Sequence, residues 1–234
     1  MSSVLIEDLS RGAQARLALV RAAVEVFGES GLEAATTRDI AQRAQQNIAA
    51  IAYYFGGKEG LYLAVAGHIV EVILARMSPV MDEAEAFLKR DKKPPQRCLE
   101  YLMRLLELSI ATNQAMIPVT GIIVREQTHP TKAFSILYQG CLERLQRLGA
   151  ELIRAYLAQE APLDQCIVRF HAMLGEALAF RFARETIMRR AGWREIGEAE
   201  ETRIKRVVTE HAELVLRGLQ RKNRRNWKAR RRIP

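Results

Sequence analysis

The segment from Thr36 to Phe55 constrains the fold of this chain most, because it contains two short helical patterns in immediate succession. In the first pattern Thr37 is a candidate N-cap, since its hydroxyl can accept a hydrogen bond from an amide of the first turn. The polar run 45–47 interrupts the pattern, and Asn47 is a candidate N-cap for the second helix. Two short helices joined by a tight turn form a helix-turn-helix, whose second helix enters the DNA major groove. Two core helices of an all-α protein would show the same periodicity, so the pattern leaves both interpretations open.

The second helical pattern predicts an apolar inner face and an uncharged outer face. At a period of 3.6 residues the inner face consists of Ile48, Ile51, Ala52 and Phe55. The outer face consists of Ala49, Ala50, Tyr53 and Tyr54. A helix that faces only water usually carries charges on its outer side. The composition of this face therefore favours a contact with another molecule.

The segment and its surroundings resemble the DNA-binding region of the TetR family of one-component transcriptional regulators. The resemblance covers roughly residues 13–63 and rests on Thr37-Arg38-Asp39-Ile40-Ala41, Tyr53-Tyr54-Phe55, Lys58-Glu59 and Leu61-Tyr62, preceded by Ala22-Ala23, Phe27, Gly31 and Ala35-Thr36-Thr37. It implies an N-terminal three-helix domain that binds operator DNA. It also implies a homodimer, and we expect a repressor that a small-molecule effector releases.

Three positions depart from the pattern of this family. Gln45 stands where the family usually has a turn glycine, and Ala50 stands where a threonine is common. Ala52 stands where a DNA-contacting tyrosine is usual. From these departures we expect a less regular turn and no tyrosine contact at position 52.

The resemblance and the side-chain chemistry together predict the residues that contact DNA. Hydroxyl groups and the Lys58 ammonium suit phosphates, whereas Arg38 can bind guanine bidentately. The methyl groups of alanine side chains suit the methyl group of thymine. The predicted DNA-binding residues are Thr37, Arg38, Gln46, Asn47, Ala49, Ala50, Tyr53, Tyr54 and Lys58.

The formal net charge of +9 is concentrated at the end of the 234-residue chain. From Arg217 onward there are nine Lys or Arg and no acidic residue, so the rest of the chain sums to zero. Residues 1–60 hold six basic and seven acidic residues, so the helix-turn-helix region is not itself basic. The basic tail could bind nucleic acid through counterion release, or it could be a flexible, solubilising terminus.

The chain shows no sustained period-two alternation, which predicts an all-α protein. We expect three parts: a helix-turn-helix domain at 12–57, a larger effector-binding and dimerisation domain at 58–219, and a basic, flexible tail at 220–234. Expected helices cover 13–27, a fourth helix from Lys58 that Pro79 stops or kinks, and then 80–90, 96–113, 117–127, 131–158, 163–190 and 199–219. No membrane-spanning segment or secretory signal is expected, which places the protein in the cytoplasm.

The C-terminal part resembles the CecR branch of the same family. The matching residues are Arg125-Glu126-Gln127, Pro130, Gly175-Glu176-Ala177-Leu178-Ala179-Phe180-Arg181 and Ala191-Gly192-Trp193. The resemblance implies a region that dimerises and senses a small molecule, and it makes drug-sensitivity and drug-export genes candidate targets. Polar residues inside apolar helices are candidate effector ligands, although structural pairs or contacts with the dimer partner explain them equally well. These are Arg125, Glu126, His171, Glu176 and Arg181.

Neither catalysis nor metal binding is expected. The four histidines lack ligand spacing, and the three cysteines are unpatterned, as is typical of reduced cytosolic thiols. Glu126 near His129 and Glu176 near His171 could form acid–base pairs, but partly buried polar pairs explain them better. We therefore expect no cofactor, no metal and no enzymatic activity.

Two other classes of function remain open. One is a helical protein-interaction module without an operator, and the other is a sequence-independent DNA binder that acts through the basic tail. For the homodimer, the amphipathic segments 163–190 and 199–219 could pack against their two-fold mates as a four-helix interface.

Overall fold

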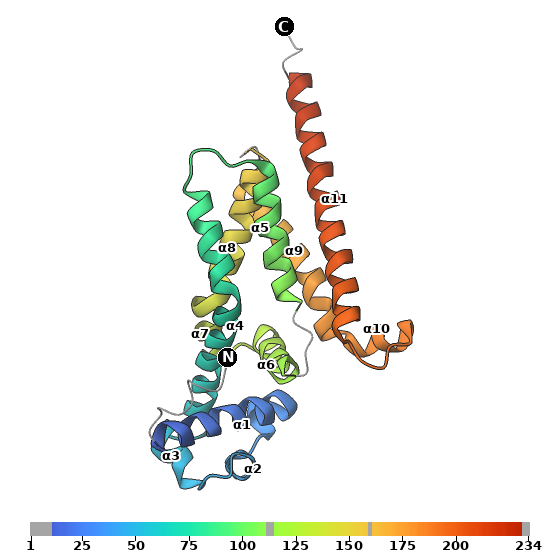
Figure 1. Cartoon of the computed structure of the whole chain (residues 1–234). Coiled ribbons are helices and arrows are strands. Elements are labelled where there is room, and N and C mark those ends of the chain that lie inside the picture. The colour runs from blue at the N-terminus through green and yellow to red at the C-terminus, as the bar shows by residue number, and fades with distance from the viewer. Residues whose placement is uncertain (1–10, 111–114, 159–160, 231–234) are drawn as a thin grey trace. The chain divides into compact units, whose positions relative to one another are not determined.

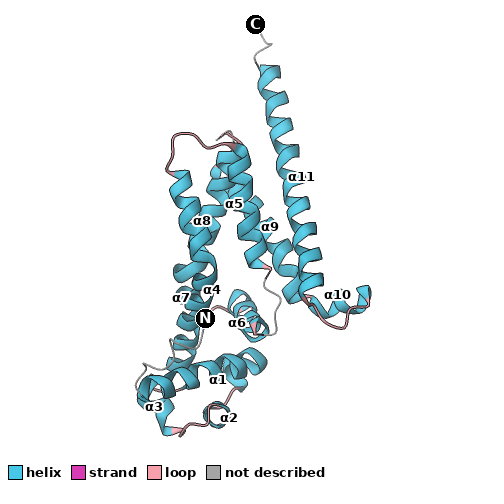
Figure 2. Cartoon of the chain, in the orientation of Figure 1, coloured by secondary structure: helices cyan, strands magenta, loops and turns pink. Residues whose placement is uncertain are grey.

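Helices make up the fold (Figures 1 and 2). The computed structural model describes residues 11–110, 115–158 and 161–230, and within these ranges no strand occurs, which confirms the all-α prediction. The elements in chain order are α1 Arg11–Ala34, α2 Thr37–Arg43, α3 Ala49–Phe55, α4 Lys58–Leu88, α5 Pro95–Ser109, α6 Met116–Thr128, α7 Lys132–Leu137, a π-helical turn Tyr138–Leu142, α8 Glu143–Tyr156, α9 Leu163–Phe182, α10 Arg184–Ala191 and α11 Glu198–Arg230.

Contacts divide the chain into two compact units. The first unit comprises residues 1–72 and 114–140, and the second comprises residues 73–113 and 141–234. Helices α1–α3, the first part of α4, α6 and α7 therefore belong together, although α6 follows α3 by some 60 residues in the chain. The second unit holds the rest of α4 together with α5 and α8–α11.

In the first unit α1 and α6 cross at unusually short range. A Cβ atom on Gly28 would lie 2.5 Å from the Cα atom of Pro118, and one on Gly121 would lie 2.6 Å from the carbonyl oxygen of Gly28. Beside this crossing the guanidinium group of Arg125 donates to the carbonyl oxygens of Phe27, Gly28 and Glu29 at 3.3, 2.8 and 3.0 Å. These carbonyls belong to the part of α1 just before residue 31, so α6 satisfies acceptors of α1 that the helix itself leaves open.

A buried carboxylate joins α6 to α4 in the same unit. Glu126 is 1% exposed and accepts hydrogen bonds from the Tyr62 hydroxyl at 2.8 Å and from the Thr131 amide at 2.9 Å. The Thr131 hydroxyl donates to the same carboxylate at 3.0 Å. Burial, together with the carboxylate beside it, raises the pKa of the Tyr62 hydroxyl. Because a buried charge is tolerated only when it is hydrogen-bonded, this group holds α4, α6 and the start of α7 in one arrangement.

The second unit is built on a larger apolar core. Its buried residues come from α4, α5, α8, α9 and α11, and include Met81, Leu102, Leu105, Leu148, Ile153, Phe170, Ile204 and Leu216. Arg144 on α8 donates to Asp82 at 2.6 Å and to Glu85 at 2.9 Å, both on α4. The Arg144 guanidinium holds the pKa of the Glu85 carboxyl below its usual value.

Several helices differ in extent from the sequence-based expectation. Helix α4 continues through Pro79 to Leu88, because Met77, Val80 and Met81 on either side of the proline are buried in the core. The expected helix 131–158 is divided by the π-helical turn. Helix α11 continues past residue 219 to Arg230. Basic residues are favourable near this end, because their positive charges interact with the negative end of the helix dipole. The expected end of α5 at residue 113 and the last four tail residues lie outside the described ranges.

Helix α4 is long and apolar enough, by length and composition, to cross a membrane. A core helix passes the same test, and α4 is buried along one side in both units. Leu61, Val65 and Ile69 are fully buried in the first unit, and Met81 and Ala84 are buried in the second.

Candidate DNA-binding surface

Thr36, and not Thr37, caps the N-terminus of α2. The Thr36 hydroxyl accepts a hydrogen bond from the Asp39 amide at 3.1 Å and donates one to the Asp39 carboxylate at 2.7 Å. The prediction of Thr37 as the cap was wrong by one residue. Both threonines can supply the hydroxyl, but only the extended backbone of Thr36 lets its hydroxyl reach the Asp39 amide. Thr37 is consequently the first residue of α2, and it is half-buried.

The turn between α2 and α3 is regular despite the absence of glycine. Gln45 adopts a left-handed conformation with φ of 53°. Its amide donates to the carbonyl of Gln42 at 3.1 Å, and the Gln46 amide donates to the carbonyl of Ala41 at 2.9 Å. These two bonds form a Schellman motif, in which glycine usually takes the left-handed position. The expectation of a less regular turn was therefore wrong, and glutamine adopts the left-handed conformation that glycine usually takes in this motif.

Ile48, and not Asn47 as predicted, is the N-cap of α3, but the Asn47 side chain still bonds the start of the helix. Its side-chain oxygen accepts a hydrogen bond from the Ala49 amide at 2.8 Å. At the other end Gly56, with φ of 73°, ends the helix. A Cβ atom on Gly60 would lie 1.8 Å from the Phe55 carbonyl oxygen, so the close approach of α4 to the end of α3 requires glycine there.

The exposed face of α3 is rotated relative to the prediction. It consists of Ile48 just before the helix, Ala49, Ala52 and Tyr53, with Ile48 50% and Tyr53 82% exposed. Ala50 and Tyr54, which were expected to be outermost, are half-buried, whereas Ile51 is buried as expected. The hydrophobicity of Ile48 and Ala52 suggested a core position, but the packing of α3 leaves them outside. Sequence analysis therefore missed two residues of this surface.

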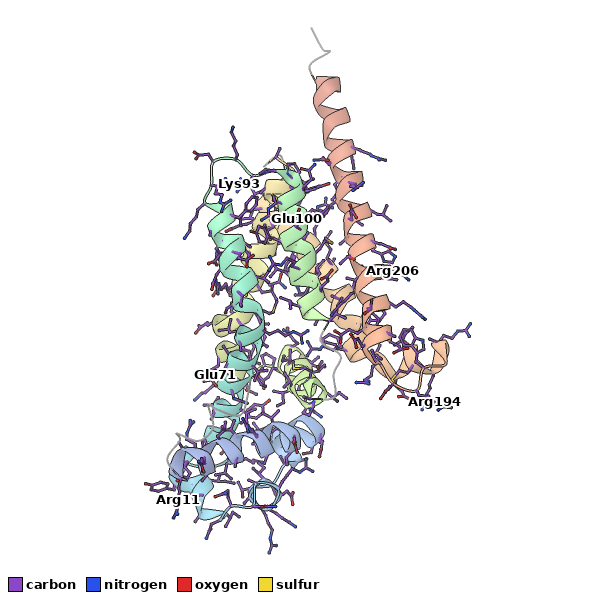
Figure 3. The ribbon with its side chains drawn as sticks, in the orientation of Figure 1. Arg11, Glu71, Lys93, Glu100, Arg194 and Arg206 are labelled. Atoms are coloured by element: carbon purple, nitrogen blue, oxygen red, sulfur yellow. The ribbon has the colours of Figure 1, made fainter. Side chains whose placement is uncertain are left out.

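Ion pairs and an arginine–aromatic contact fix α2 and α3 on α1. Arg43 at the end of α2 pairs with Glu29 at 2.9 Å and Glu25 at 3.4 Å, both on α1. The guanidinium of Arg16 on α1 lies 5.2 Å from the centre of the Phe55 ring. Helix α1 begins at Arg11, which is labelled in Figure 3. These contacts join α2 and α3 to α1.

The remaining DNA-binding candidates differ in their exposure to solvent and in their hydrogen bonds within the chain. Arg38 and Asn47 are exposed, and Gln46 is half-buried. The Lys58 ammonium donates to the carbonyl oxygens of Glu33 and Ala35 at 3.2 and 3.3 Å. Lys58 therefore also ties the start of α4 to the end of α1, a role that sequence analysis did not predict.

The five candidate effector residues are divided between the two units. Arg125 and Glu126 belong to the first, where their partners are the backbone of α1 and the pair Tyr62 and Thr131. His171, Glu176 and Arg181 belong to the second unit, on α9. The pKa of Arg181 is lowered to about 10 by burial and by the positive charge of Arg76.

The two suspected acid–base pairs are not formed. His129 contacts Thr128 at 3.1 Å while Glu126 is occupied by Tyr62 and Thr131. Glu176 instead contacts His211 on α11 at 2.6 Å. His171 contacts Gln146 on α8 at 3.0 Å. Helix packing, and not spacing in the chain, selected these partners.

Two family models match the chain. Residues 19–65 match the model of bacterial regulatory proteins of the tetR family, which covers α2 and α3. Residues 94–219 match the model of the C-terminal domain of the HTH-type transcriptional dual regulator CecR. This chain belongs to the TetR family. The match at 94–219 spans more than half of the chain, so this TetR-family regulator also has a CecR-type C-terminal domain.

Individual relatives agree with this assignment. The chain is 37% identical over 211 residues to the HTH-type transcriptional dual regulator CecR of Shigella flexneri, with 89% of this chain and 94% of that protein covered. A TetR-like regulator from Rhodococcus sp. RHA1 superimposes with a TM-score of 0.59 at 18% identity, covering 90% of this chain and 99% of the other. HlyIIR, a hemolysin II transcriptional regulator, gives a TM-score of 0.58 at 20% identity, covering 85% and 98%. Both of these regulators have the same fold as this chain.

Proposed function

We propose that this TetR-family regulator is a homodimeric repressor in the bacterial cytoplasm, and that a small-molecule effector releases it from its operator. The observation that carries the proposal is the exposed face of Ile48, Ala49, Ala52 and Tyr53, presented by the short helix α3. A face without charge on such a helix fits the major groove, where methyl groups of thymine offer apolar contacts.

The DNA contacts divide into two kinds. Thr37, Tyr53, Tyr54 and Lys58 contact phosphates, which position the protein without reading sequence. Arg38 reads a guanine, since it is exposed at the start of α2. The set is completed by two pairs of residues. The side-chain amides of Gln46 and Asn47 lie close to the turn, and the methyl groups of Ala49 and Ala50 lie on α3. Ile48 and Ala52 join this set because the structure exposes them.

The homodimer uses α9 and α11 of the second unit. Both helices expose large apolar side chains, namely Leu163, Ile167, Val168 and Phe182 on α9 and Leu214 and Val215 on α11. We call these six residues the apolar dimer face. Other apolar residues of the predicted segments 163–190 and 199–219, such as Phe170, Leu174 and Val208, are buried in the unit itself. Two copies that pack these faces together form a four-helix interface.

Release requires that the effector favour a dimer whose recognition helices do not match two half-sites, roughly 34–36 Å apart. Helix α4 is one candidate transmitter, because it contributes residues to both units. Helix α6 is a second, since Arg125 and Glu126 bond it to α1 and α4. His171, Glu176 and Arg181 remain candidate effector ligands. An effect of about 5–150-fold on operator affinity would be usual.

The genes under control are proposed from the resemblance to the CecR branch, and the mode of regulation also draws on the relative. The Shigella flexneri protein is named a dual regulator, which makes activation at some promoters a second mode to test beside repression. Drug-export and drug-sensitivity genes are the proposed targets, with repression as the main mode.

The decisive experiment is footprinting on the fragment upstream of the protein's own gene, with a scrambled fragment as control. We expect protection of a two-fold symmetric site, and we expect Arg38→Ala to need a higher protein concentration for the same protection. A protein that ends at residue 219 separates the alternatives, since it lacks the basic tail. If the helix-turn-helix binds the operator, the truncated protein must still protect the two-fold symmetric site. Equal binding to both fragments, lost with the tail, would identify a sequence-independent binder. A protein that binds neither fragment is an interaction module.

A further inference from the structure

A cavity of about 530 Å³ lies in the second unit. It is lined by Pro95, Gln96 and Leu99 of α5, Tyr156 at the end of α8, and Arg217, Gln220 and Arg221 of α11. Helices α5 and α11 run side by side here (Figure 1). Its volume falls within the range of small-molecule sites in proteins, roughly 300–1,000 Å³.

One side of the cavity is cationic. Arg217 and Arg221 are four residues apart on α11, so their side chains emerge one turn apart on the same face. Arg217 pairs with Glu213 at 2.5 Å, whereas Arg221 forms no ion pair within the described part of the chain. The side-chain amides of Gln96 and Gln220 add hydrogen-bond donors. Arginine is well suited to a carboxylate, because its planar fork donates two parallel hydrogen bonds.

The start of α5 adds a smaller positive contribution to the cavity. Pro94 precedes the helix and supplies no side-chain cap, and Pro95 takes the first helical position. The N-terminal end of a 15-residue helix carries a partial positive charge. The N-terminal turns of α5 lie between Lys93 and Glu100, which Figure 3 labels. The helix end thus reinforces the arginines.

Part of the cavity lining is apolar. Pro95, Leu99 and the ring of Tyr156 form this wall, and Tyr156 is only 5% exposed. Apolar walls combined with a few polar groups are typical of sites that orient an amphiphilic ligand. A purely inorganic anion would leave this wall unused.

We propose that this cavity binds a small organic anion with a flat apolar body. Its carboxylate accepts hydrogen bonds from Arg221 and Arg217, and its body packs against Leu99 and Tyr156. The bound anion bridges α5 and α11. This binding needs neither operator DNA nor the dimer, so a test of ligand binding is independent of a test of the proposed regulatory function.

Calorimetric titration with 1-naphthoate tests the proposal, and neutral 1-naphthamide of the same shape is the control ligand. At constant ionic strength we expect saturable binding of the carboxylate and at least about tenfold weaker binding of the amide, because a charge-assisted pair is lost. Arg221→Gln should weaken naphthoate binding by about tenfold or more while circular dichroism stays unchanged. Lys222→Gln removes the same charge from the neighbouring exposed position and should leave binding within about twofold.

Leu99→Ala probes the apolar wall and should weaken naphthoate without affecting the preference for the anion over the amide. Three results would overturn the proposal. The first is no saturable naphthoate binding, and the second is equal affinity for naphthamide. The third is equal weakening by Arg221→Gln and Lys222→Gln, because general attraction by the basic helix would then explain the binding.

Discussion

The Tyr62 hydroxyl donates a 2.8 Å hydrogen bond to the buried carboxylate of Glu126, which joins α4 to α6 in the first unit. Phe27 of α1 packs edge-on against the Tyr62 ring, with 5.0 Å between the ring centres. One tyrosine thus contacts the helix that supports the recognition helix and the helix that carries Glu126.

Tyr62→Phe should therefore destabilise the protein. The variant keeps the ring but leaves Glu126 with Thr131 as its remaining donor. We expect the free energy of unfolding to fall by about 1–3 kcal/mol in urea denaturation followed by circular dichroism. Tyr53→Phe is the matched control, because Tyr53 is 82% exposed and its hydroxyl should contribute nothing to stability. Equal stability of the two variants would show that the buried bond contributes no net stabilisation.

Gln45→Gly should stabilise the protein. Gln45 has φ of 53°, where a side chain costs roughly 1–2 kcal/mol, partly offset by the greater entropy of glycine in the unfolded chain. We expect a gain of about 0.5–1 kcal/mol in the free energy of unfolding. Gln46→Gly lies one residue later, outside the left-handed region, and should lose stability instead. A loss of stability in Gln45→Gly would mean that the glutamine side chain contributes more than the strain costs.

Arg38→Ala and Lys58→Ala should weaken operator binding in different ways. The first should lose preference at one base pair, at about 1–3 kcal/mol, in binding assays on single-substituted operators. The second should weaken all sequences alike and reduce the slope of log affinity against log salt by about one unit. Because Lys58 also bonds the carbonyls of Glu33 and Ala35, thermal melts must accompany the second assay. An unchanged salt slope would exclude Lys58 as a phosphate contact.

Leu214→Glu should convert the dimer into monomers and weaken operator binding with it. Leu214 is 68% exposed in the single chain, so a charge there should destabilise the dimer interface and not the folded subunit. Leu178 is less suitable, because it packs partly buried against the core. Ile117→Glu, at a 41% exposed position of α6, is the control and should remain dimeric in analytical ultracentrifugation. A folded Leu214→Glu dimer would place the interface elsewhere.

The cysteines should resist alkylation in the folded protein. Burial raises the pKa of Cys98 and of Cys141 to about 11, and it also raises the pKa of Cys166. Since the thiolate is the reactive form, a raised pKa leaves little of it at about pH 8. Iodoacetamide should label all three residues rapidly only after denaturation, as mass spectrometry can measure. Rapid labelling of the native protein would contradict their burial.

Local interactions explain why the helix-turn-helix could be predicted. Asn47 accepts a bond from an amide two residues away at the start of α3, and Gln45 and Gln46 close the turn through bonds to residues three and five positions earlier. Such bonds depend on neighbouring residues, which a sequence displays directly. Even the error at Thr37 was a shift of one residue between two equivalent hydroxyls.

The partners of buried polar groups could not be predicted in the same way. Glu126 bonds Tyr62, which is 64 residues away, although His129 is nearer in the chain. Glu176 contacts His211 on α11, although His171 is nearer. Periodicity shows which side of a helix is apolar but not which helix will cover it.

The sequence by itself determined the helical class, the position of the helix-turn-helix and the family, because these depend on spacing and short-range hydrogen bonds. Only the tertiary structure decided that Ile48 and Ala52 are exposed on α3 and that α6 packs on α1. The close crossing at Gly28 and Gly121 joins segments more than 90 residues apart. Burial is a property of the whole packed unit, and therefore no local pattern could assign these faces.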